Sequence, residues 1–351
     1  MALLCSNCRL LRIFEESKHR IGARRAGQQA EMEQGASAEP LVLISSGKGE
    51  HRTLKAGYRQ LAKHLRAAHC DVDRLTAPLT DTALEGCAIL ILGAPTRRFT
   101  LEELEAVKSY LLRGGAVLAL GAAGAANHNG SAGGTANSLS AAASLAALPS
   151  TAAASNLNYL LEEFGIALVD DGVIASAFTS YLHPREVLVD EGLLSPDMLV
   201  YCAGRCRAST GSQALSSTDE NGAPAVRFAF PHGCTVVAQE PAAAILSSGR
   251  IAHPYNMCIG AVWWGDAGTA PRGGAAGTSS ARSDTSAAGS VARSTTSVAS
   301  GGGLGRLAVL GSAAMFDDEW LGREANTAIL DFILGCVTNG TLMDCPTASD
   351  E

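Results

Sequence analysis

The sequence predicts an α/β fold, a mainly parallel sheet covered by helices on both faces. Two short apolar runs, residues 87–92 and 116–120, have no alternation of polar and apolar residues. Runs of this kind are typical of strands that are buried on both faces. The stretch between them, residues 100–114, has a helical pattern. A strand, a helix and a second strand within about 35 residues predict a βαβ unit, the crossover that parallel strands require.

The helix of this unit has recognisable ends. Thr100 and Glu103 have the spacing of a capping box, in which each side chain satisfies the other residue's free backbone amide. Gly114 stands where a helix end needs a residue that tolerates positive φ. Between these ends the sequence predicts one apolar face, made by Leu101, Leu104, Val107 and Leu111.

The segments before this unit predict further elements of the same kind. Residues 40–46 are apolar and predict the first core strand. Residues 70–75 alternate and predict a strand nearer an edge of the sheet. Between the two strands we expect a helix with one apolar face, which carries Leu54, Tyr58, Leu61 and Leu65.

The C-terminal half predicts a short helix, several strands and two longer helices. Apolar residues 157, 160, 161 and 164 form the short helix, which Gly165 stops. A second helix is expected from His183-Pro184 to Gly192, because proline is harmless at the first helical position. The last helix is expected at 324–337. The strands are expected at 166–169, 173–174, 226–230, 234–238, 243–246, 258–264 and 306–311.

Two segments are too poor in large apolar residues to form a packed core. Residues 122–154 and 266–303 consist largely of Ala, Gly, Ser, Thr and Asn, and such segments bury too little apolar surface to offset their ordering entropy. We expect both to be disordered loop insertions in a single α/β domain, residues 40–340. Residues 1–39 are expected to be a disordered extension, in which Met32 is an alternative start, and residues 341–351 a polar tail.

The composition limits the classes of function. The formal net charge of −7 argues against nucleic acid as a partner, because binders of nucleic acid carry a basic excess. No apolar run reaches the roughly 18 residues that predict a membrane span, so we expect no membrane insertion. Glu15 and Glu16 argue against a secretory signal. The 10 cysteines are scattered along the chain, which favours an intracellular, reducing environment.

Three candidate catalytic or phosphate-binding motifs are incomplete. Gly47-Lys48-Gly49 follows a strand, but it lacks the spacing of a P-loop or a dinucleotide fingerprint. Residues 121–124 follow a central strand like a nucleophile elbow, but they offer alanine where serine or cysteine should stand. Ser312 follows another strand, where a serine is more often a helix cap than a nucleophile. We therefore assign no catalytic residue and no cofactor.

The candidate metal ligands do not form a complete set either. The pairs Cys5/Cys8 and Cys202/Cys206, the second with His183 or His232, fall short of the four ligands of a structural zinc site. His183, His232 and His253 each adjoin a proline and do not assemble by spacing. The acidic residues Asp317, Asp318 and Glu319 lie after a strand. They could bind a ligand there, as residues at strand ends of α/β sheets often do, or they could form the start of a helix, where acidic residues are favoured. We assign no metal site.

Several stretches resemble the GIFT domain of the intraflagellar transport protein 52 family. The most specific are residues 181–194, with His183-Pro184-Arg185-Glu186, and residues 305–321, with the sequence AVLGSAAMF. Three further parts of the chain also fit the family: residues 157–165, residues 324–326 and the βαβ unit. All of these stretches occur in the order of the family once the two insertions are left out. The resemblance covers about residues 40–340.

This resemblance implies an amidotransferase-like or Rossmann-like fold and a function without catalysis. The family implies a scaffold subunit of intraflagellar transport complex B, which acts in cilium or flagellum assembly and ciliary cargo transport. Its implied partners are other complex B subunits, and its implied places are the cilium, the ciliary base and the cytoplasm. The family continues past this domain, and we expect docking regions beyond Glu351. The alternatives are a small-ligand or carbohydrate-binding module and a hydrolase of amidotransferase-like fold.

Overall fold

A computed structural model describes residues 39–124, 150–176, 183–208, 215–218, 224–265 and 305–338. The helices are α2 (Arg59–Ala67), α3 (Leu101–Leu112), α5 (Thr151–Ala154), α6 (Asn158–Leu161), α7 (Pro196–Ala208) and α8 (Asn326–Val337), with 3-10 turns at Glu162–Phe164 and Ala314–Phe316. The strands of the main sheet are β1 (Leu41–Ser45), β2 (Asp71–Leu75), β3 (Cys87–Gly93), β4 (Ala116–Leu120), β12 (Ala243–Ser247), β14 (Cys258–Trp264) and β15 (Arg306–Leu310). The shorter strands are β5 (Ile166–Leu168), β6 (Ile174–Ala175), β7 (Glu186–Val189), β8 (Leu215–Thr218), β9 (Pro224–Val226), β10 (Phe228–Pro231), β11 (Val236–Ala238) and β13 (Ala252–His253).

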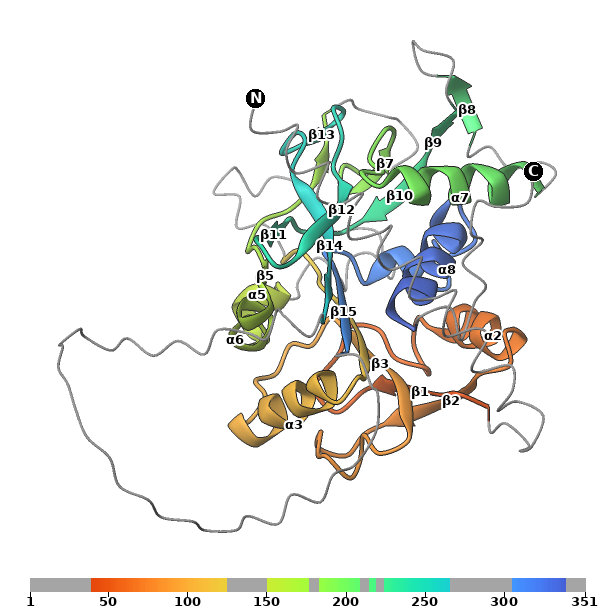
Figure 1. Cartoon of the computed structure of the whole chain (residues 1–351). Coiled ribbons are helices and arrows are strands. Elements are labelled where there is room, and N and C mark those ends of the chain that lie inside the picture. The colour runs from red at the N-terminus through yellow and green to blue at the C-terminus, as the bar shows by residue number, and fades with distance from the viewer. Residues whose placement is uncertain are drawn as a thin grey trace, which may run out of the picture.

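The centre of the molecule is a seven-stranded sheet in the order β12-β14-β15-β4-β3-β1-β2 (Figure 1). The five strands from β2 to β15 run parallel to one another. β14 is antiparallel to β15, and β12 is antiparallel to β14. The predicted mainly parallel sheet is therefore confirmed, and two strands from the β-rich region extend it.

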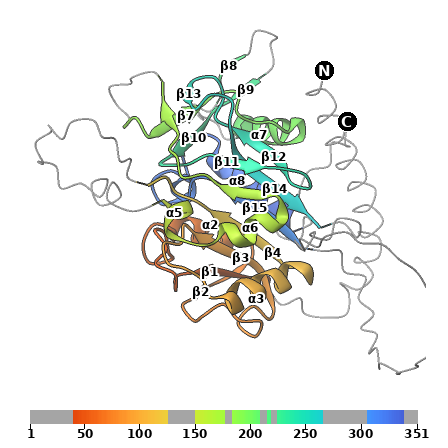
Figure 2. The same cartoon turned by 90° about the vertical axis from the view of Figure 1, so that its left-hand side faces the viewer.

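Helices cover both faces of this sheet. One core cluster joins α2, α7 and α8 to side chains such as Ile44, Ile91 and Leu118. The other joins α3 and α6 to the alternate side chains Leu43, Leu90 and Val117. Successive strand residues point to opposite faces, so β1, β3 and β4 each contribute to both clusters. Figure 2 shows α3, α5 and α6 together in front of the sheet.

The βαβ unit matches its prediction at both helix ends. Thr100 Oγ1 accepts a hydrogen bond from the Glu103 amide at 3.3 Å, and Glu103 Oε2 accepts one from the Thr100 amide at 2.7 Å. Gly114 has φ +102°. The predicted apolar face is wrong at its first residue, because Leu101 is 68% exposed. Tyr110 is buried instead, under the start of β4.

The helix predicted from His183 to Gly192 is wrong. This segment contains β7, which pairs antiparallel with β10. Val187 and Val189 are buried, whereas Glu186 and Leu188 are only partly buried. This alternation is typical of a half-buried strand. Gly192 does not end a helix but permits a close approach, since a Cβ there would lie 2.5 Å from the Ser247 carbonyl oxygen of β12.

Helix α7 was not predicted. Its buried side chains include Met198, Cys202, Ala203 and Cys206, and alanine and cysteine give a weak apolar pattern. The helix near the N-terminus is also shorter than predicted. It starts at Arg59, so Leu54 lies outside it, while Leu61 and Leu65 are buried as expected. The last helix begins at Asn326 and not at Glu324.

The ends of the first predicted insertion are part of the folded core. Ala122 and Ala123 are buried, and α5 begins at Thr151, which is itself buried. The disorder predicted over 122–154 is therefore wrong at both ends, because Ala122 and Thr151 are buried and hydrogen bonded to each other. The remainder of that insertion, the 266–303 insertion, most of the 1–39 extension and the 341–351 tail lie outside the described residues.

Short antiparallel pairs surround one end of the sheet. They are β10-β7, β11-β5, β13-β6 and β8-β9. The first three pairs bring segments far apart in sequence together above the carboxyl ends of the parallel strands (Figure 1). Within the described ranges, every helix is too short or too polar to cross a membrane.

Candidate functional site

The carboxyl ends of the parallel strands form the place where α/β sheets usually bind ligands. β1, β3, β4 and β15 all end at this edge. Helix α2 follows β1 on one face, and α3 follows β3 on the other face. The chain therefore changes direction between β1 and β3, which makes the crevice between their ends the topological switch point.

This crevice is filled by the chain's own loops. The loop after β1 lies on the loop after β3, and their backbones are hydrogen bonded. The amides of Thr96 and Arg97 donate to the Lys48 carbonyl at 3.1 and 2.9 Å, and the His51 amide donates to the Ala94 carbonyl at 3.2 Å. Backbone groups that could bind a ligand are thus used between the two loops.

An internal carboxylate takes the position of an anion in the Gly47-Lys48-Gly49 turn. Glu50 Oε2 accepts a hydrogen bond from the Lys48 amide at 2.8 Å, and Glu50 also accepts one from the Ser45 hydroxyl. The Lys48 ammonium is 2.5 Å from Glu103 Oε2. A phosphate would have to displace both carboxylates to reach these donors.

The elbow position after β4 has neither a nucleophile nor free amides. Ala122 donates its amide to Thr151 Oγ1 at 3.1 Å, and Ala123 donates its amide to the His232 carbonyl at 2.9 Å. An oxyanion hole needs such amides to be directed at the reacting group. Here α5 and the turn after β10 occupy them.

Ser312 lies at the end of β15 and stabilises a turn. Its hydroxyl donates to the Pro231 carbonyl and accepts a hydrogen bond from the Met315 amide at 3.2 Å. The residue before it must be glycine, because a Cβ on Gly311 would lie 1.9 Å from the Cys234 carbonyl oxygen. The glycine-serine pair therefore reflects close packing and capping.

The acidic residues after β15 also have internal partners. Asp317 Oδ2 binds Arg52 Nη2 at 2.8 Å, while its Oδ1 accepts hydrogen bonds from the amides of Glu319 and Trp320. Burial raises the pKa of the Asp317 carboxyl, and the Arg52 guanidinium partly offsets this shift. Asp318 Oδ1 accepts the Gln60 amide at 2.7 Å in the first turn of α2. The cluster thus connects α2 to the end of β15.

The pairing of β7 with β10 brings two of the three proline-flanked histidines together. The ring centroids of His183 and His232 are 5.8 Å apart, and Glu186 Oε1 is 4.0 Å from His232 Nε2. Burial lowers the pKa of the His232 ring. His253 lies apart from them on β13 and contacts Tyr255. Spacing along the sequence could not reveal the pair, because the strand predicted here as a helix creates it.

The cysteine pair of α7 is part of the core. Cys202 and Cys206 are buried, and burial raises the pKa of the Cys202 thiol. Neither joins a group of three ligands, and among the described residues no such group of His, Cys, Asp and Glu side chains occurs. Cys5 and Cys8 lie outside the described residues.

Two residues of the filled crevice, His51 and Arg52, were not predicted from the sequence. His51 Nε2 is buried without a hydrogen-bond partner, and burial, with the charge of Arg52 beside it, lowers the pKa of the ring to about 4. The partner of Arg52, Asp317, is 265 residues away in the sequence. Only the fold brings them together.

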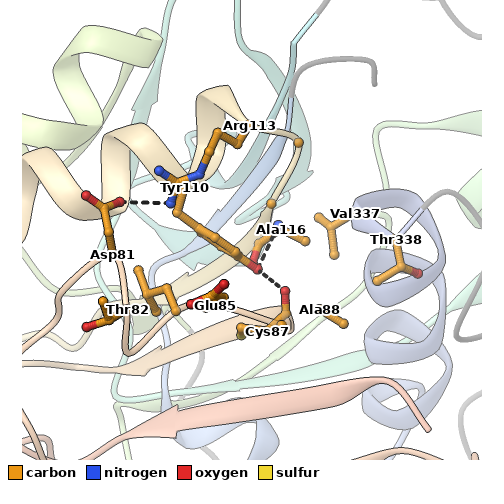
Figure 3. Close-up of a pocket in the computed structure, with 14 residues that line it drawn as sticks. Asp81, Thr82, Glu85, Cys87, Ala88, Tyr110, Arg113, Ala116, Val337 and Thr338 are labelled. Atoms are coloured by element: carbon orange, nitrogen blue, oxygen red, sulfur yellow. Dashed lines mark hydrogen bonds and ion pairs between the residues drawn. The ribbon is translucent and has the colours of Figure 1, made fainter. Parts of the chain in front are cut away.

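A groove of about 680 Å³ lies at the opposite edge of the sheet, where the strands begin (Figure 3). We call it the amino-edge groove. The Tyr110 hydroxyl donates to the Cys87 carbonyl at 3.2 Å and accepts the Ala116 amide at 3.2 Å. On its rim Arg113 Nη2 is 2.8 Å from Asp81 Oδ1. The end of α8, Val337 and Thr338, lines the other side.

A family model, two curated proteins and a solved structure point to the same family. The model of the IFT52 GIFT domain matches residues 149–344, and a model described as ABC-type uncharacterized transport system matches residues 39–182. The intraflagellar transport protein 52 homologs of mouse and human are each 28% identical over 302 residues, 86% of this chain. The solved structure entitled mmIFT52 N-terminal domain is 26% identical, with a TM-score of 0.59, over 86% of this chain and 98% of that one.

The match covers only part of these relatives. The chain spans 56% of the mouse protein and 54% of the human protein, which is about half the length of each. The solved N-terminal domain is covered almost completely. The likeness thus concerns the N-terminal α/β domain of the relatives.

Proposed function

Because this chain belongs to the IFT52 GIFT domain family, we propose that it acts in intraflagellar transport as a noncatalytic scaffold subunit of complex B. It would bind other complex B subunits, at the ciliary base, in the cilium or flagellum and in the cytoplasm. Membership of the family, matched over residues 149–344, is the observation that carries this proposal. Its role in cilium assembly and cargo transport rests on the same observation.

The carboxyl edge of the sheet supports a role without catalysis. Its turn donors bind Glu50, its elbow amides bind Thr151 and the His232 carbonyl, and its serine binds the Pro231 carbonyl. An acyl-transfer enzyme needs a nucleophile, a base within hydrogen-bond reach and an oxyanion hole. The described residues at this edge are instead used to hold the loops together. The filled crevice also argues against the small-ligand alternative, because the same loops occupy the place where a ligand would bind.

Proximity labelling in ciliated cells tests the scaffold role. The chain is fused to a promiscuous biotin ligase, which also records weak contacts, and the labelled proteins are identified by mass spectrometry. Complex B subunits should be enriched over a cell line that expresses the ligase alone. The variant Val309→Asp, which we expect to unfold the domain because Val309 is fully buried, provides a second control. Equal labelling of complex B subunits by all three would contradict the proposal.

The enzyme alternative has its own test at Ser312. The purified chain should release no ammonia from glutamine and should not react with a serine-directed fluorophosphonate. Ser312→Ala should only lower the free energy of unfolding, by about 1–3 kcal/mol, because the Pro231 carbonyl and the Met315 amide lose a buried partner. Ammonia release, or labelling that disappears in Ser312→Ala, would favour a hydrolase.

A further inference from the structure

Helix α2 lies on the outer side of the molecule (Figure 1) and presents a basic face to the solvent. Its apolar side chains point into the core, whereas Arg59, Lys63 and Arg66 are exposed. Residues at positions i, i+4 and i+7 lie on one face of a helix, so these three cations form a row. Lys55 extends the row just before the helix, since Arg59 Nη2 donates to the Lys55 carbonyl at 3.1 Å. We call these four residues the basic row.

The basic row is not neutralised by acidic side chains of the domain. Cations elsewhere in the described residues commonly pair with carboxylates, as Lys48 does with Glu103. None of the four cations of the row forms an ion pair with a carboxylate of the described residues. Asp318, at the start of α2, accepts the Gln60 amide instead. The row is therefore a local positive surface on a chain whose formal net charge is −7.

The charges of the row oppose the stability of α2. Like charges that are three or four residues apart on a helix repel each other. Arg59 also stands at the positive end of the helix dipole, in a first turn without acidic residues. Only Arg66 has an evident role in the fold, because its guanidinium donates to the Val72 carbonyl at 3.1 Å. A surface that is kept although it costs stability is typical of a binding function.

The surroundings of the row favour a short acidic protein segment over other anions. The net charge of −7 repels an extended polyanion such as nucleic acid, whereas a short segment is affected mainly by the charges near it. α2 has no exposed large apolar side chain, which a helix that binds a membrane surface needs. It also offers no aromatic ring for stacking of bases, since the adjacent Tyr58 is fully buried.

We propose that the basic row binds an acidic segment of a partner protein, whose carboxylates pair with the exposed cations. From Arg59 to Arg66 the row is roughly 10 Å long, which matches about two turns of an acidic helix. Charge pairs at an exposed surface contribute orientation and a fast association more than high affinity. The inference concerns one surface of the domain and does not rest on the proposed function.

Fluorescence anisotropy with the purified full chain tests this proposal. The probe is a fluorescein-labelled oligo-glutamate peptide, which should bind the wild type and should dissociate as the salt concentration rises. Lys55→Gln/Arg59→Gln/Lys63→Gln, the row variant, should bind the peptide about tenfold more weakly, because three of its charge contacts are lost. Arg66 stays unchanged in this variant, since it also contacts β2.

A matched control removes the same charge elsewhere. Arg97→Gln/Arg98→Gln/Arg250→Gln changes three exposed cations outside α2 and should bind the peptide like the wild type. Equal affinities of the two triple variants would overturn the proposal, because they would show that only the total charge matters. Absence of binding to the wild type would overturn it as well.

Two further probes distinguish the classes of anion. An oligo-uridylate and vesicles of phosphatidylserine and phosphatidylcholine should bind the wild type more weakly than the peptide does. Tighter binding of either probe that is lost in the row variant would overturn the proposal in favour of nucleic acid or a membrane.

Circular dichroism melting separates binding from folding. Because the row variant relieves repulsion along α2, it should melt no lower than the wild type. Lys63→Gln alone, in the middle of the row, should already weaken peptide binding about twofold. A lower melting temperature together with lost binding would assign the row to the stability of the fold and contradict the proposal.

Discussion

At the scale of single residues, Asp331 joins the three helices on one face of the sheet. Its side chain is completely buried on α8. Oδ1 lies 2.6 Å from His64 Nε2 of α2, and Oδ2 lies 2.7 Å from Arg205 Nη2 of α7. The two partners are partly exposed. A buried carboxylate is tolerated only when such groups neutralise it.

Removing both partners of Asp331 should therefore destabilise the fold strongly. We expect His64→Ala/Arg205→Ala to lower the free energy of unfolding by about 3–5 kcal/mol, because an uncompensated charge stays buried. Adding Asp331→Asn to this variant should recover part of the loss, since the amide carries no charge. Urea denaturation measures both effects. A third substitution that destabilises the protein further would show that the charge is not the cause.

His51 should make stability depend on pH. Its folded-state pKa of about 4 lies below the ordinary value of 6.5, so the unfolded chain binds the proton first as the pH falls. The contribution of His51 is therefore complete above pH 6.5 and decreases toward pH 4. A shift of one pKa unit corresponds to about 1.4 kcal/mol of stability for a fully buried group. Because the His51 ring is partly exposed, solvent screens the effect, and we expect a total loss of only about 1–2 kcal/mol.

The measurement is the urea midpoint at a series of pH values. His51→Gln should flatten the decrease between pH 6.5 and 4, whereas His253→Gln, at an exposed position on β13, should not. Protonation of Asp317, whose pKa is raised, changes stability in the opposite direction in all three proteins. Parallel curves for His51→Gln and the wild type would refute the assignment.

At the scale of the elements, the sheet has a buried centre and protected edges. β15 lies between β4 and β14, and its residues from Leu307 to Leu310 are fully buried. At the β2 edge, Arg66 Nη2 donates to the Val72 carbonyl at 3.1 Å, and Asp73 Oδ1 accepts the Arg74 amide at 2.6 Å. Side chains thus occupy groups that a further strand would need.

Val309→Asp in β15 should unfold the domain. A carboxylate at this position has neither water nor a partner, and the expected loss of several kcal/mol is comparable with the total stability of a typical domain, about 5–15 kcal/mol. Val237→Asp in β11 is the matched control, since Val237 is 40% exposed. Circular dichroism melting should show a cooperative transition for the control alone. Wild-type melting of Val309→Asp would contradict the central place of β15.

At the scale of the whole molecule, segments from both ends of the sequence share one core. The first core cluster contains both Val42 and Val337, and the second contains both Leu43 and Val309. This arrangement supports the proposal of one α/β domain over residues 40–340. The low-complexity segments within 122–154 and 266–303 would then be loops of that domain.

Limited proteolysis tests this division of the chain. Within residues 40–340, trypsin should cut first at Arg272, Arg282 or Arg293, in the second segment, because the first segment contains no Lys or Arg. Proteinase K should cut early in both segments. The fragments should remain associated in gel filtration, since β15 and α8 pack against the N-terminal strands. Early cleavage inside 40–121, or separation of the fragments, would contradict a single domain.

The elements that local forces define could be predicted from the sequence. The capping box, the positive φ of Gly114 and the unbroken apolar strands all depend on residues close together in the chain, and these features specified the βαβ unit and the parallel sheet. The family resemblance also depends on such short stretches. The exposure of Leu101 was not predictable in this way, because helical spacing predicts an apolar face but not what covers each end of it.

The contacts between segments that are distant in the sequence became visible only in the folded molecule. β7 is a strand because β10 pairs with it, although Pro184 and Gly192 suggest helix ends. The same pairing brings His183 to His232, and the fold brings Arg52 to Asp317 and Asp331 to its two partners. Each of these contacts joins residues from different elements, whose apposition depends on the packing of the whole core. The filled carboxyl edge and the open amino-edge groove are consequences of that packing, and neither left a pattern in the sequence.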